Sequence, residues 1–438
     1  MMDTIRIDLS RSAGGIKPLN ATNGGPIHKR HAADQYRSNF DAYRAARIPY
    51  SRNHDSAFCD VYGGPYSHDI TAIFPVFDAD PFDPASYDFA CTDESILTCL
   101  DAGTKTFFRL GQSIEHQIKK HGTLPPKDFH KWAVICEHII RHYNEGWADG
   151  FRLGMEYWEI WNEPDLDDDD SPDKRTWGGT RTQFFDFYAE AAQYLKACFP
   201  GLKIGGPALA YREDWADAFL AEMRSRGVPI DFFSWHIYTT DPCAVSEKAA
   251  RIRAMLDRHG YTQAESILNE WNYIRGWTTD YVYSLEAIHG MKGAAFLAAC
   301  MAQAQASSID MLMYYDTRLS AFNGAFDSYS LHPLKGYTPL AWFGRFYDMD
   351  HTVPVQTQVP DIYPLCAVDT DGKIMCMVTY YTENDAAPTR TITLECGRDV
   401  MFDVYWLDET HDGCLFPAGG GMPLVLKPQT VLLFVEHI

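Results

Sequence analysis

The chain has 438 residues, of which 46% are hydrophobic and 22% are charged, a composition typical of globular rather than disordered proteins. Acidic residues number 59 against 38 lysines and arginines, so the formal net charge is −21. This charge would repel nucleic acid phosphates and anionic membrane surfaces, and it argues against both as partners. A neutral substrate suits the charge balance better.

The N-terminus and the cysteines predict a soluble protein with a cytoplasmic location. The first residues lack a basic segment followed by the apolar run of an export signal, and no apolar run of about 18 residues follows. Eleven scattered cysteines favour reduced, buried thiols over a disulfide framework. No CxxC pair or His/Cys cluster supports a metal site, and we expect neither metal nor cofactor. The oligomeric state stays open, and a homo-oligomer is compatible with the sequence.

Residues 5–9 form the first predicted strand, and residues 16–345 then alternate short apolar runs with longer amphipathic ones. This alternation is typical of repeated βα units around a parallel sheet. Eight strands are predicted, the number that closes a (β/α)₈ TIM barrel. They cover residues 16–20, 48–52, 104–110, 155–161, 202–206, 230–236, 266–270 and 311–315. Runs with the helical period are predicted to cover the outside of the barrel at residues 35–47, 129–143, 182–199, 215–226, 247–259 and 291–307.

From about residue 353 the pattern changes to alternating apolar and polar residues separated by turn signals. We interpret residues 346–438 as an antiparallel β-sandwich domain. The opening strand, within residues 1–15, is predicted to return and join that sandwich. The fold class is therefore α/β, a TIM barrel over residues 16–345 with a C-terminal β-sandwich.

Two segments place a glutamate where a barrel strand opens into solvent, WEIWNEP at residues 158–164 and SILNEWN at residues 266–272. Pro164 cannot continue a strand ladder, so the strand stops there and Glu163 is predicted at its rim. Glu270 has the corresponding place before the polar loop that begins at Asn272. The chain between the two glutamates accommodates three βα units. They would come from strands four and seven and face each other across the barrel mouth.

Two facing carboxyl groups are what cleavage of a glycosidic bond requires, one to protonate the departing oxygen and one to face the anomeric carbon. A retaining enzyme separates them by about 5 to 5.5 Å and an inverting enzyme by roughly 6.5 to 9.5 Å. The alternative for a strand-end glutamate is an ion pair with a loop arginine. Two such ends at compatible barrel positions favour catalysis by Glu163 and Glu270.

Several neighbours could bind sugar or position the carboxyl groups. The amide of Asn162 could donate to the sugar's 2-hydroxyl, although a turn or cap role is the alternative. Arg52 could keep Glu270 ionised or form an ordinary ion pair at the mouth, and we weigh the two equally. Tyr238 could donate a hydrogen bond to Glu270.

Histidines and aromatic residues at strand ends supply further candidates. His54 and His236 could bind sugar hydroxyls or be satisfied core histidines. Trp161 and Trp271 border the glutamates and could either form the floor under a sugar or plug the barrel. Weaker binding candidates at the ends of strands one and eight are Asn20, Asn23, Tyr315, Asp316 and Arg318, the last of which could bind a uronate.

The combination of Trp-Asn-Glu-Pro at strand four with a second glutamate at strand seven resembles the 4/7 superfamily of retaining glycosidases. Three further segments, RNHD at residues 52–55, FFSWHIY at 232–238 and NEWN at 269–272, make the chain similar to glycoside hydrolase family 39. This resemblance covers about residues 16–345 and the β-rich tail. It implies Glu163 as acid/base and Glu270 as nucleophile, with the −1 sugar surrounded by Asn162, His54, His236 and Tyr238.

We therefore predict a retaining, exo-acting glycoside hydrolase that works by double displacement on a glycoside or oligosaccharide. The family resemblance favours a β-xylosidase or related β-glycosidase, and the alternative is an α-L-arabinosidase or α-L-iduronidase type of activity. An endo-acting polysaccharide hydrolase would need an open groove, whereas the long loop at residues 60–84 favours a closed pocket. A non-catalytic carbohydrate-binding protein should lack one carboxylate, and both are present.

Two further expectations concern charge near the catalytic motif. Glu163 must start protonated, so burial or the nearby charge of Glu270 should raise its pKa. The acidic run at residues 165–170 could bind Ca²⁺ through oxygen ligands, but a solvated acidic loop is favoured because its spacing does not match an EF-hand.

Overall fold

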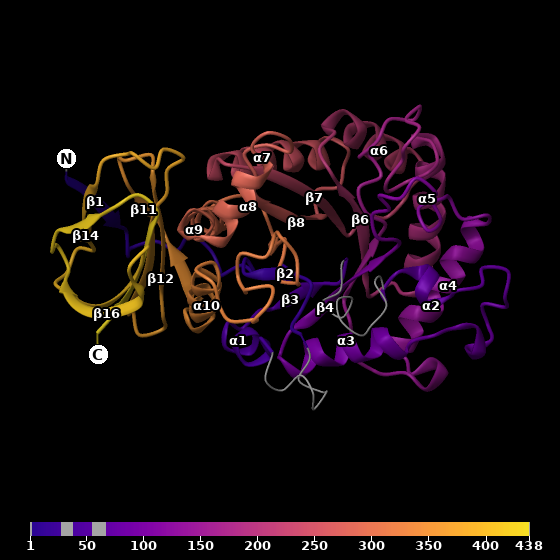
Figure 1. Cartoon of the computed structure of the whole chain (residues 1–438), viewed down its shortest axis with the longest axis horizontal. Helices are drawn as coiled ribbons and strands as arrows, with labels where there is room; N and C mark the ends of the chain where they lie inside the picture. The colour runs from indigo at the N-terminus through magenta and orange to yellow at the C-terminus, as the bar shows by residue number, and fades with distance from the viewer. Residues whose placement is uncertain (1, 28–37, 55–66, 438) are drawn as a thin grey trace.

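The computed structural model describes residues 2–27, 38–54 and 67–437. Asp55 and the first part of the predicted 60–84 loop lie outside this range, as does the start of the helix predicted at 35–47. The described chain forms a closed barrel and a separate β-sheet domain beside it (Figure 1). The predicted fold class is confirmed. In the described residues, no helix combines the length and the apolar character needed to cross a lipid bilayer.

Eight parallel strands close the barrel in chain order. They are β2 (Ala21–Asn23), β3 (Tyr50–Arg52), β4 (Lys105–Leu110), β5 (Tyr157–Ile160), β6 (Lys203–Leu209), β7 (Phe232–Thr239), β8 (Glu265–Tyr273) and β9 (Met311–Tyr314). The predicted first strand was wrong by several residues, because residues 16–20 precede β2. β8 extends three residues beyond Glu270, where the sequence had indicated a loop.

Apolar side chains fill the lower interior of the barrel. They form one buried cluster, Ala21, Phe107, Tyr157, Phe232, Ile267, Met311 and Met313. Because this layer closes the barrel from below, a ligand can reach the strands only from their carboxyl ends, where the βα loops lie.

Helices surround the barrel (Figure 1). They are α1 (Phe40–Ala45), α2 (Ile70–Ile73), α3 (Ala90–Asp101), α4 (Phe129–Asn144), α5 (Arg181–Cys198), α6 (Glu213–Ser225), α7 (Pro242–Arg258), α8 (Tyr281–His289), α9 (Met291–Gln305) and α10 (Tyr337–Arg345). Local signals explain several starts: Asp128 accepts from the N–H of Lys131, and Thr180 forms a capping box with Gln183. α9 is buried almost all round, because it packs between the barrel and the second domain.

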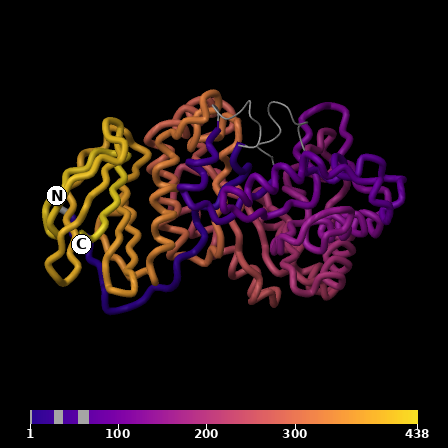
Figure 2. Tube along the Cα trace, turned by 90° about the horizontal axis from the view of Figure 1, so that it is seen from below, coloured from indigo at the N-terminus to yellow at the C-terminus, as the bar shows by residue number. Residues whose placement is uncertain are grey.

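The second domain is a sandwich of two sheets. One contains, in order, β10 (His351–Val353), β12 (Ile362–Val368), β13 (Ile374–Tyr380), β18 (Thr430–Glu436), β15 (Met401–Leu407) and β16 (Asp412–Gly419), all antiparallel. The other contains β11 (Val355–Gln356), β1 (Met2–Ile7), β14 (Arg390–Glu395) and β17 (Leu424–Leu426). β1 pairs in parallel with β14, so this sheet is mixed and not purely antiparallel. The N-terminal strand thus lies among the C-terminal strands (Figure 2).

One cysteine pair departs from the expectation of reduced thiols. Cys366 and Cys376 form a disulfide between β12 and β13, where the antiparallel register sets them directly opposite each other. The expectation was wrong at this pair because the pairing depends on strand register, which cysteine spacing does not reveal. Other cysteines in the described ranges are free thiols, among them Cys99, Cys136, Cys198, Cys243, Cys300, Cys396 and Cys414.

Candidate active site

Glu163 lies three residues beyond the end of β5, immediately before Pro164. Its backbone is left-handed, with φ of 48°, a conformation that non-glycine residues adopt only when the surroundings hold it. Two hydrogen bonds do so. The N–H of Glu163 donates to the carbonyl of Ala208 (2.9 Å), and the hydroxyl of Thr176 donates to the carbonyl of Glu163 (2.6 Å). The side chain is turned inward and buried rather than exposed at a rim.

Glu270 lies within β8, and β7 beside it supplies His236. A register irregularity between Trp235 and His236 aligns His236 with Glu270 across the two strands. This irregularity matters because a regular ladder would pair His236 with the neighbouring residue of β8 and turn the two side chains to different positions.

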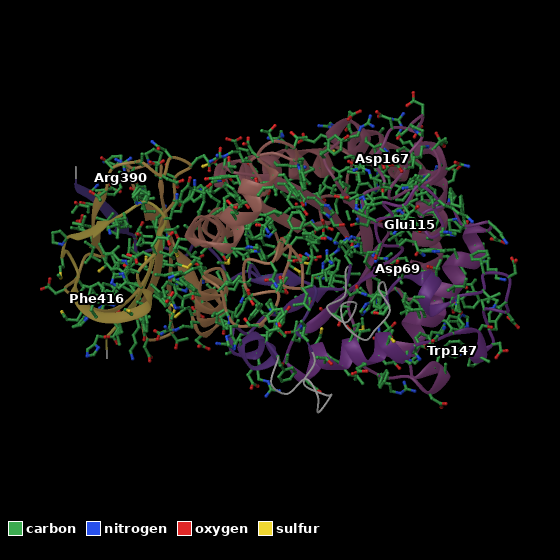
Figure 3. The ribbon with its side chains drawn as sticks, viewed as in Figure 1. Asp69, Glu115, Trp147, Asp167, Arg390 and Phe416 are labelled. Carbon is green, nitrogen blue, oxygen red and sulfur yellow. A yellow bond between two sulfur atoms is a disulfide. The ribbon has the colours of Figure 1, made fainter. Side chains whose placement is uncertain are left out.

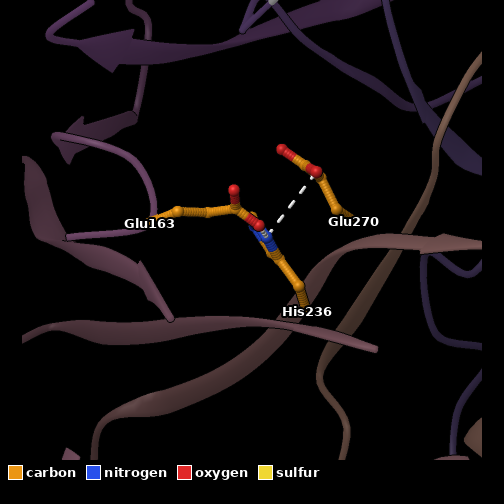
Figure 4. Close-up of side chains that lie close together, drawn as sticks. All are labelled: Glu163, His236 and Glu270. Atoms are coloured by element: carbon orange, nitrogen blue, oxygen red, sulfur yellow. Dashed lines mark hydrogen bonds and ion pairs between the residues drawn. The ribbon is translucent and has the colours of Figure 1, made fainter. Parts of the chain in front are cut away.

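The two glutamates meet at one histidine. His236 Nδ1 lies 2.8 Å from Oε1 of Glu163 and 3.6 Å from Oε2 of Glu270 (Figure 4). The three side chains present atoms that all lie within 4.8 Å of one another. Two carboxyl groups distant in sequence therefore face a common space at the barrel mouth.

Arg52 connects the Glu270 side of the site with the Glu163 side, where it contacts Asn162. Its Nη1 donates to Glu270 Oε1 (2.8 Å), its Nη2 to Asn162 Oδ1 (2.7 Å) and its Nε to Glu159 Oε2 (2.7 Å). Glu159 also accepts from the amide of Asn269 (2.6 Å). All five side chains are buried. The arginine thus fixes the nucleophile candidate and the amide next to Glu163 in one rigid network.

Tyr238 and His54 lie on either side of Glu270. The hydroxyl of Tyr238 donates to Glu270 Oε2 (3.0 Å), and His54 Nε2 lies 3.9 Å from Glu270 Oε1. Each oxygen of Glu270 therefore has a donor, Arg52 on one side and Tyr238 on the other. A carboxylate with such donors is oriented and stabilised in its charged form.

Burial dominates the protonation of the site. It raises the pKa of Glu163 to about 8, with the nearby charge of Asp165 as a second cause. Burial also raises the pKa of Glu270, while His236 and Arg52 act to lower it. Burial lowers the pKa of His236 to about 4, so its imidazole is neutral near pH 7. Glu163 is therefore held protonated at neutral pH, whereas Arg52 favours the ionised form of Glu270.

Several buried polar atoms at the site have no hydrogen-bond partner among the described residues. Nδ2 of Asn162 and Nε2 of His236 are two of them. Buried donors and acceptors normally pair, and leaving one unpaired costs about 1–3 kcal/mol. Asn162 Oδ1 is fixed by Arg52, so its Nδ2 is a preset donor for a ligand oxygen.

The tryptophans beside the glutamates do not face this space. Trp271 packs toward Phe296 of α9 (ring centroids 6.1 Å apart), and Trp161 packs against Trp177 and Phe187 (5.2 and 5.4 Å). Both rings lie in the layer between the barrel and the helices. The expectation that Trp271 contacts the sugar is therefore corrected: it follows Glu270 in a strand, and successive strand side chains point to opposite faces.

The asparagines near strand one support the frame instead of lining the mouth. Asn20 donates to the carbonyls of Ala46 (3.0 Å) and Leu340 (3.1 Å), so it holds the outer layer together. Asn23 accepts from Arg52 (3.2 Å) and is fully buried. Its place is behind the arginine, and its contribution to the site is to orient Arg52.

Tyr315, Asp316 and Arg318 follow β9 and interact with one another. Arg318 donates through Nε to Asp316 (2.6 Å) and through Nη2 to the hydroxyl of Tyr315 (3.0 Å). The Tyr315 ring lies 6.4 Å from that of Tyr238, edge to face. Tyr315 thus borders the site, while Asp316 already balances the charge of Arg318.

The acidic run at residues 165–170 is not a solvated loop throughout. Asp165 is fully buried and accepts from the backbone N–H groups of residues 210–212 (2.8 to 2.9 Å). Asp167 pairs with Arg175 (2.7 Å), and Figure 3 labels Asp167 on this loop after β5. These carboxylates are occupied by protein donors, which disfavours a Ca²⁺ site.

The sequence prediction missed two buried acids, Glu159 and Asp165. Glu159 could have been found, because it lies two residues beyond the interior Tyr157 on the same face of β5. Asp165 could not, because the backbone groups that it caps are more than forty residues away. The Glu163, His236 and Glu270 cluster also has the spacing of a metal site, but the guanidinium of Arg52 would repel a cation there.

Comparison with known proteins yields one family and several similar structures. The model of Glycosyl hydrolases family 39 matches residues 7–346. A β-xylosidase from Caldicellulosiruptor saccharolyticus is 34% identical over 146 residues, which are 32% of this chain and 26% of that protein. The matched stretch thus spans only about a quarter of that relative.

Among the solved structures that resemble the whole chain, two illustrate the range. A glucosidase from Croceicoccus marinus has a TM-score of 0.79 at 23% identity, covering 100% of this chain and 99% of that one. A family 39 β-xylosidase from Caulobacter crescentus has a TM-score of 0.66 at 15% identity, covering 99% and 100%. At these identities the likeness concerns the fold.

Proposed function

This chain belongs to glycosyl hydrolase family 39, and from that premise we propose that it is a retaining, exo-acting glycoside hydrolase. One observation carries the proposal: oxygens of Glu163 and Glu270 lie within 4.8 Å of each other around His236. That spacing supports the short separation of the carboxyl groups in retaining enzymes, about 5 to 5.5 Å, over the roughly 6.5 to 9.5 Å of inverting ones.

In the first step Glu270 is the nucleophile. Its Oε attacks the anomeric carbon while the glycosidic C–O bond breaks, and Glu163 gives its proton to the departing oxygen. The product is a glycosyl ester of Glu270 and a free leaving group. Arg52 and Tyr238 hold the attacking carboxylate, and the raised pKa of Glu163 supplies the acid at neutral pH.

In the second step water replaces the leaving group. Glu163, now a carboxylate, accepts a proton from the water as its oxygen attacks the anomeric carbon, and the ester bond to Glu270 breaks. Esterification has removed the negative charge of Glu270 facing Glu163, which lowers the pKa of Glu163 and suits it to act as base. We assign to Asn162 Nδ2, which has no partner among the described residues, the role of donating to the sugar's 2-hydroxyl during both steps.

Exo action is supported by the described segment that leads into α2. Asp69 in this segment accepts from Arg109 (2.7 Å) and from the N–H of Ser113 (2.9 Å), which ties the segment to β4 and to the residues after it. Figure 3 labels Asp69. We take this attachment as support for a pocket that accepts one terminal sugar.

A β-xyloside is the first substrate we propose, because the curated β-xylosidase is 34% identical over its matched stretch. The similarity to a glucosidase over the whole chain makes a glucoside the next choice. α-L-arabinosides and α-L-iduronides are the alternatives among substrates.

A panel of nitrophenyl glycosides tests activity and sugar together: β-xyloside, β-glucoside, β-galactoside, α-L-arabinofuranoside and α-L-iduronide. We expect hydrolysis of the β-xyloside and, by NMR at early times, release of the sugar in the same anomeric form as the substrate. Release of the opposite anomer would contradict the retaining mechanism. On xylo-oligosaccharides, exo action should give xylose and the oligomer one unit shorter from the first time point, whereas early release of mid-sized oligomers without xylose would contradict it.

A further inference from the structure

A lysine is buried in the layer between the barrel and α7. Lys248 is only 6% exposed, and α7 packs on β7 and β8 (Figure 1). The other side chains on the same face of the helix are apolar: Val245, Ala249, Ile252, Met255 and Leu256. Lysine is almost never fully buried unless its ammonium group is paired, because moving a charge out of water is costly. Packing alone therefore does not account for a lysine at this position.

The ammonium group of Lys248 contacts the backbone of the histidine at the site. Its Nζ donates to the carbonyl oxygen of His236 (2.8 Å) and lies 5.6 Å from the ring centre of Trp235. β7 continues to Thr239, but its pairing with β6 ends at Leu209 and Trp235. Lys248 thus donates to a carbonyl of β7 just beyond the point at which β6 stops pairing with this strand.

His236 is also the residue at which the register between β7 and β8 shifts. A register shift disrupts the ladder locally, so the backbone there needs other hydrogen bonds to hold it in one conformation. The imidazole on this backbone reaches both glutamates, 2.8 Å from Glu163 and 3.6 Å from Glu270 (Figure 4). Lys248 therefore fixes the backbone from which the imidazole extends.

Acidic groups keep the amine of Lys248 charged despite its burial. Burial lowers the pKa of Lys248 to about 8, whereas the negative charges of Asp165 and Glu213 act to raise it. The amine is therefore mostly protonated at neutral pH. A hydrogen bond from a charged donor is roughly twice as strong as one between neutral groups, so the carbonyl of His236 is held firmly.

We propose that Lys248 is a positioning residue for the proposed reaction: its hydrogen bond to the carbonyl of His236 holds the imidazole between Glu163 and Glu270. The lysine acts through His236 and not by contact with the reacting groups. The inference rests on the proposed function, because His236 contacts the acid that this function assigns. An apolar residue in place of Lys248 would suit the helix face but would leave the carbonyl without its donor.

A double-mutant cycle tests whether Lys248 acts through His236. Lys248→Met removes the amine and keeps an unbranched side chain that suits the apolar face. It is made in the parent and in His236→Ala, and kcat/KM is measured on the nitrophenyl glycoside that the parent hydrolyses fastest. We expect a loss of about tenfold in the parent and of at most about twofold in His236→Ala, which has no imidazole to displace. Equal losses in the two backgrounds, or no loss in the parent, would overturn the proposal.

Lys196→Met is the matched control. Lys196 of α5 also donates to a backbone carbonyl, that of Leu202 (2.8 Å), and it pairs with Asp231 (2.7 Å). Both partners directly precede barrel strands, β6 and β7, so they lie at the end of the barrel away from the mouth. Lys196→Met should lower the unfolding temperature but leave kcat/KM near the parental value. A loss of activity equal to that in Lys248→Met would count against a specific role of Lys248.

A spectroscopic measurement separates failure of the positioning role from failure of the proposed function. The imidazole nitrogen resonances of protein labelled at histidine report the hydrogen bonding of each ring, and the signal missing in His236→Ala identifies His236. We expect Lys248→Met to shift this signal and Lys196→Met to leave it in place. Lys248→Leu takes the place of Lys248→Met in both measurements if the methionine variant does not fold.

The outcomes distinguish the two proposals. If the parent hydrolyses no glycoside of the panel, the proposed function fails, while a shifted His236 signal in Lys248→Met still supports the positioning role. Hydrolysis by the parent with an unmoved signal overturns the positioning role alone. Absence of both hydrolysis and shift overturns both.

Discussion

The carboxyl ends of β5 and β8 present the same side chain in two different settings. After β5, Glu163 lies on a left-handed backbone and touches a neutral histidine. Within β8, Glu270 directly follows the register irregularity with β7 and receives hydrogen bonds from Arg52 and Tyr238. Burial raises the pKa of both, but only Glu270 has a guanidinium in direct contact. Neighbours, not residue type, divide the two glutamates into an acid and a nucleophile.

The β8 side should respond most strongly to mutation. Glu270→Ala removes the nucleophile, and we expect kcat on an aryl glycoside to fall on the order of 10⁴ to 10⁶-fold. Azide can enter the vacated space and should restore turnover, giving a glycosyl azide of inverted configuration. Glu286→Ala, an exposed glutamate on α8, is the control and should match the parent. Parental activity in Glu270→Ala would remove the assignment.

On the β5 side the loss should depend on the leaving group. Glu163→Ala should lower kcat/KM by about 10² to 10⁴-fold for alkyl glycosides, whose departure needs a proton. Dinitrophenyl glycosides leave without one and should lose far less in the first step. Azide should here give a glycosyl azide of retained configuration.

The kcat/KM of the parent should fall above about pH 8, where Glu163 loses its proton. Glu163→Ala should lack this alkaline limb of the pH profile. Equal losses for both leaving groups would contradict the acid role.

Mutation of Arg52 tests whether its positive charge is what makes Glu270 in β8 a nucleophile and leaves Glu163 after β5 an acid. Arg52→Met leaves Glu159 and Glu270 buried without their positive partner, and it should raise the pKa of Glu270. We expect kcat/KM to fall about 10² to 10³-fold and the acidic limb of its pH profile to move upward. Arg52→Lys restores the positive charge. It should return the acidic limb of the pH profile to its parental position while recovering only part of the lost kcat/KM. An unmoved limb in a folded Arg52→Met would show that the cation only supports packing.

The free energy of unfolding should depend on pH because of Glu163. In the folded state its pKa is about 8, against an ordinary value of 4.5. The folded state therefore keeps a proton that the unfolded chain loses, and stability falls as pH rises from about 4.5 to 8. Glu163→Gln cannot ionise, so it should gain up to a few kcal/mol over the parent across that window. Thermal unfolding at pH 5 and pH 8 measures this, with Glu286→Gln as control. A gain that does not grow with pH would contradict the raised pKa.

The barrel and its two glutamates could be predicted because local rules govern them. Strand alternation and the break at Pro164 locate Glu163, and the same alternation places Glu159 inside the barrel and Trp271 outside. Trp271 was misjudged because nearness to Glu270 in sequence was taken for nearness in space.

Other features depend on contacts between distant segments. The cap that Asp165 provides for residues 210–212 and the pairing of Cys366 with Cys376 follow from the assembled fold. The irregularity that brings His236 beside Glu270 is likewise invisible in the sequence. These contacts arise only once strands and loops have docked, and one sequence contains no signal for them.

The smallest expected effect concerns the second domain, which touches the β8 end of the barrel. Glu383 accepts from the hydroxyl of Tyr273 at the end of β8 (3.0 Å) and from Arg275 in the loop that follows this strand (2.8 Å). Glu383→Ala should loosen this end of β8 and lower kcat/KM by a few fold, because Glu270 lies on the same strand as Tyr273.

A neighbouring acid offers a matched control for this last change. Asp385 comes from the same loop but pairs with Lys292 of α9 (2.9 Å). Asp385→Ala removes a contact between the domains without touching β8, so it should lower the unfolding temperature as Glu383→Ala does but leave kcat/KM unchanged. If the two variants lose activity equally, the sandwich acts on the whole barrel. If only Glu383→Ala does, the second domain specifically holds the nucleophile's strand, an attachment that the acid's end at β5 lacks among the described residues.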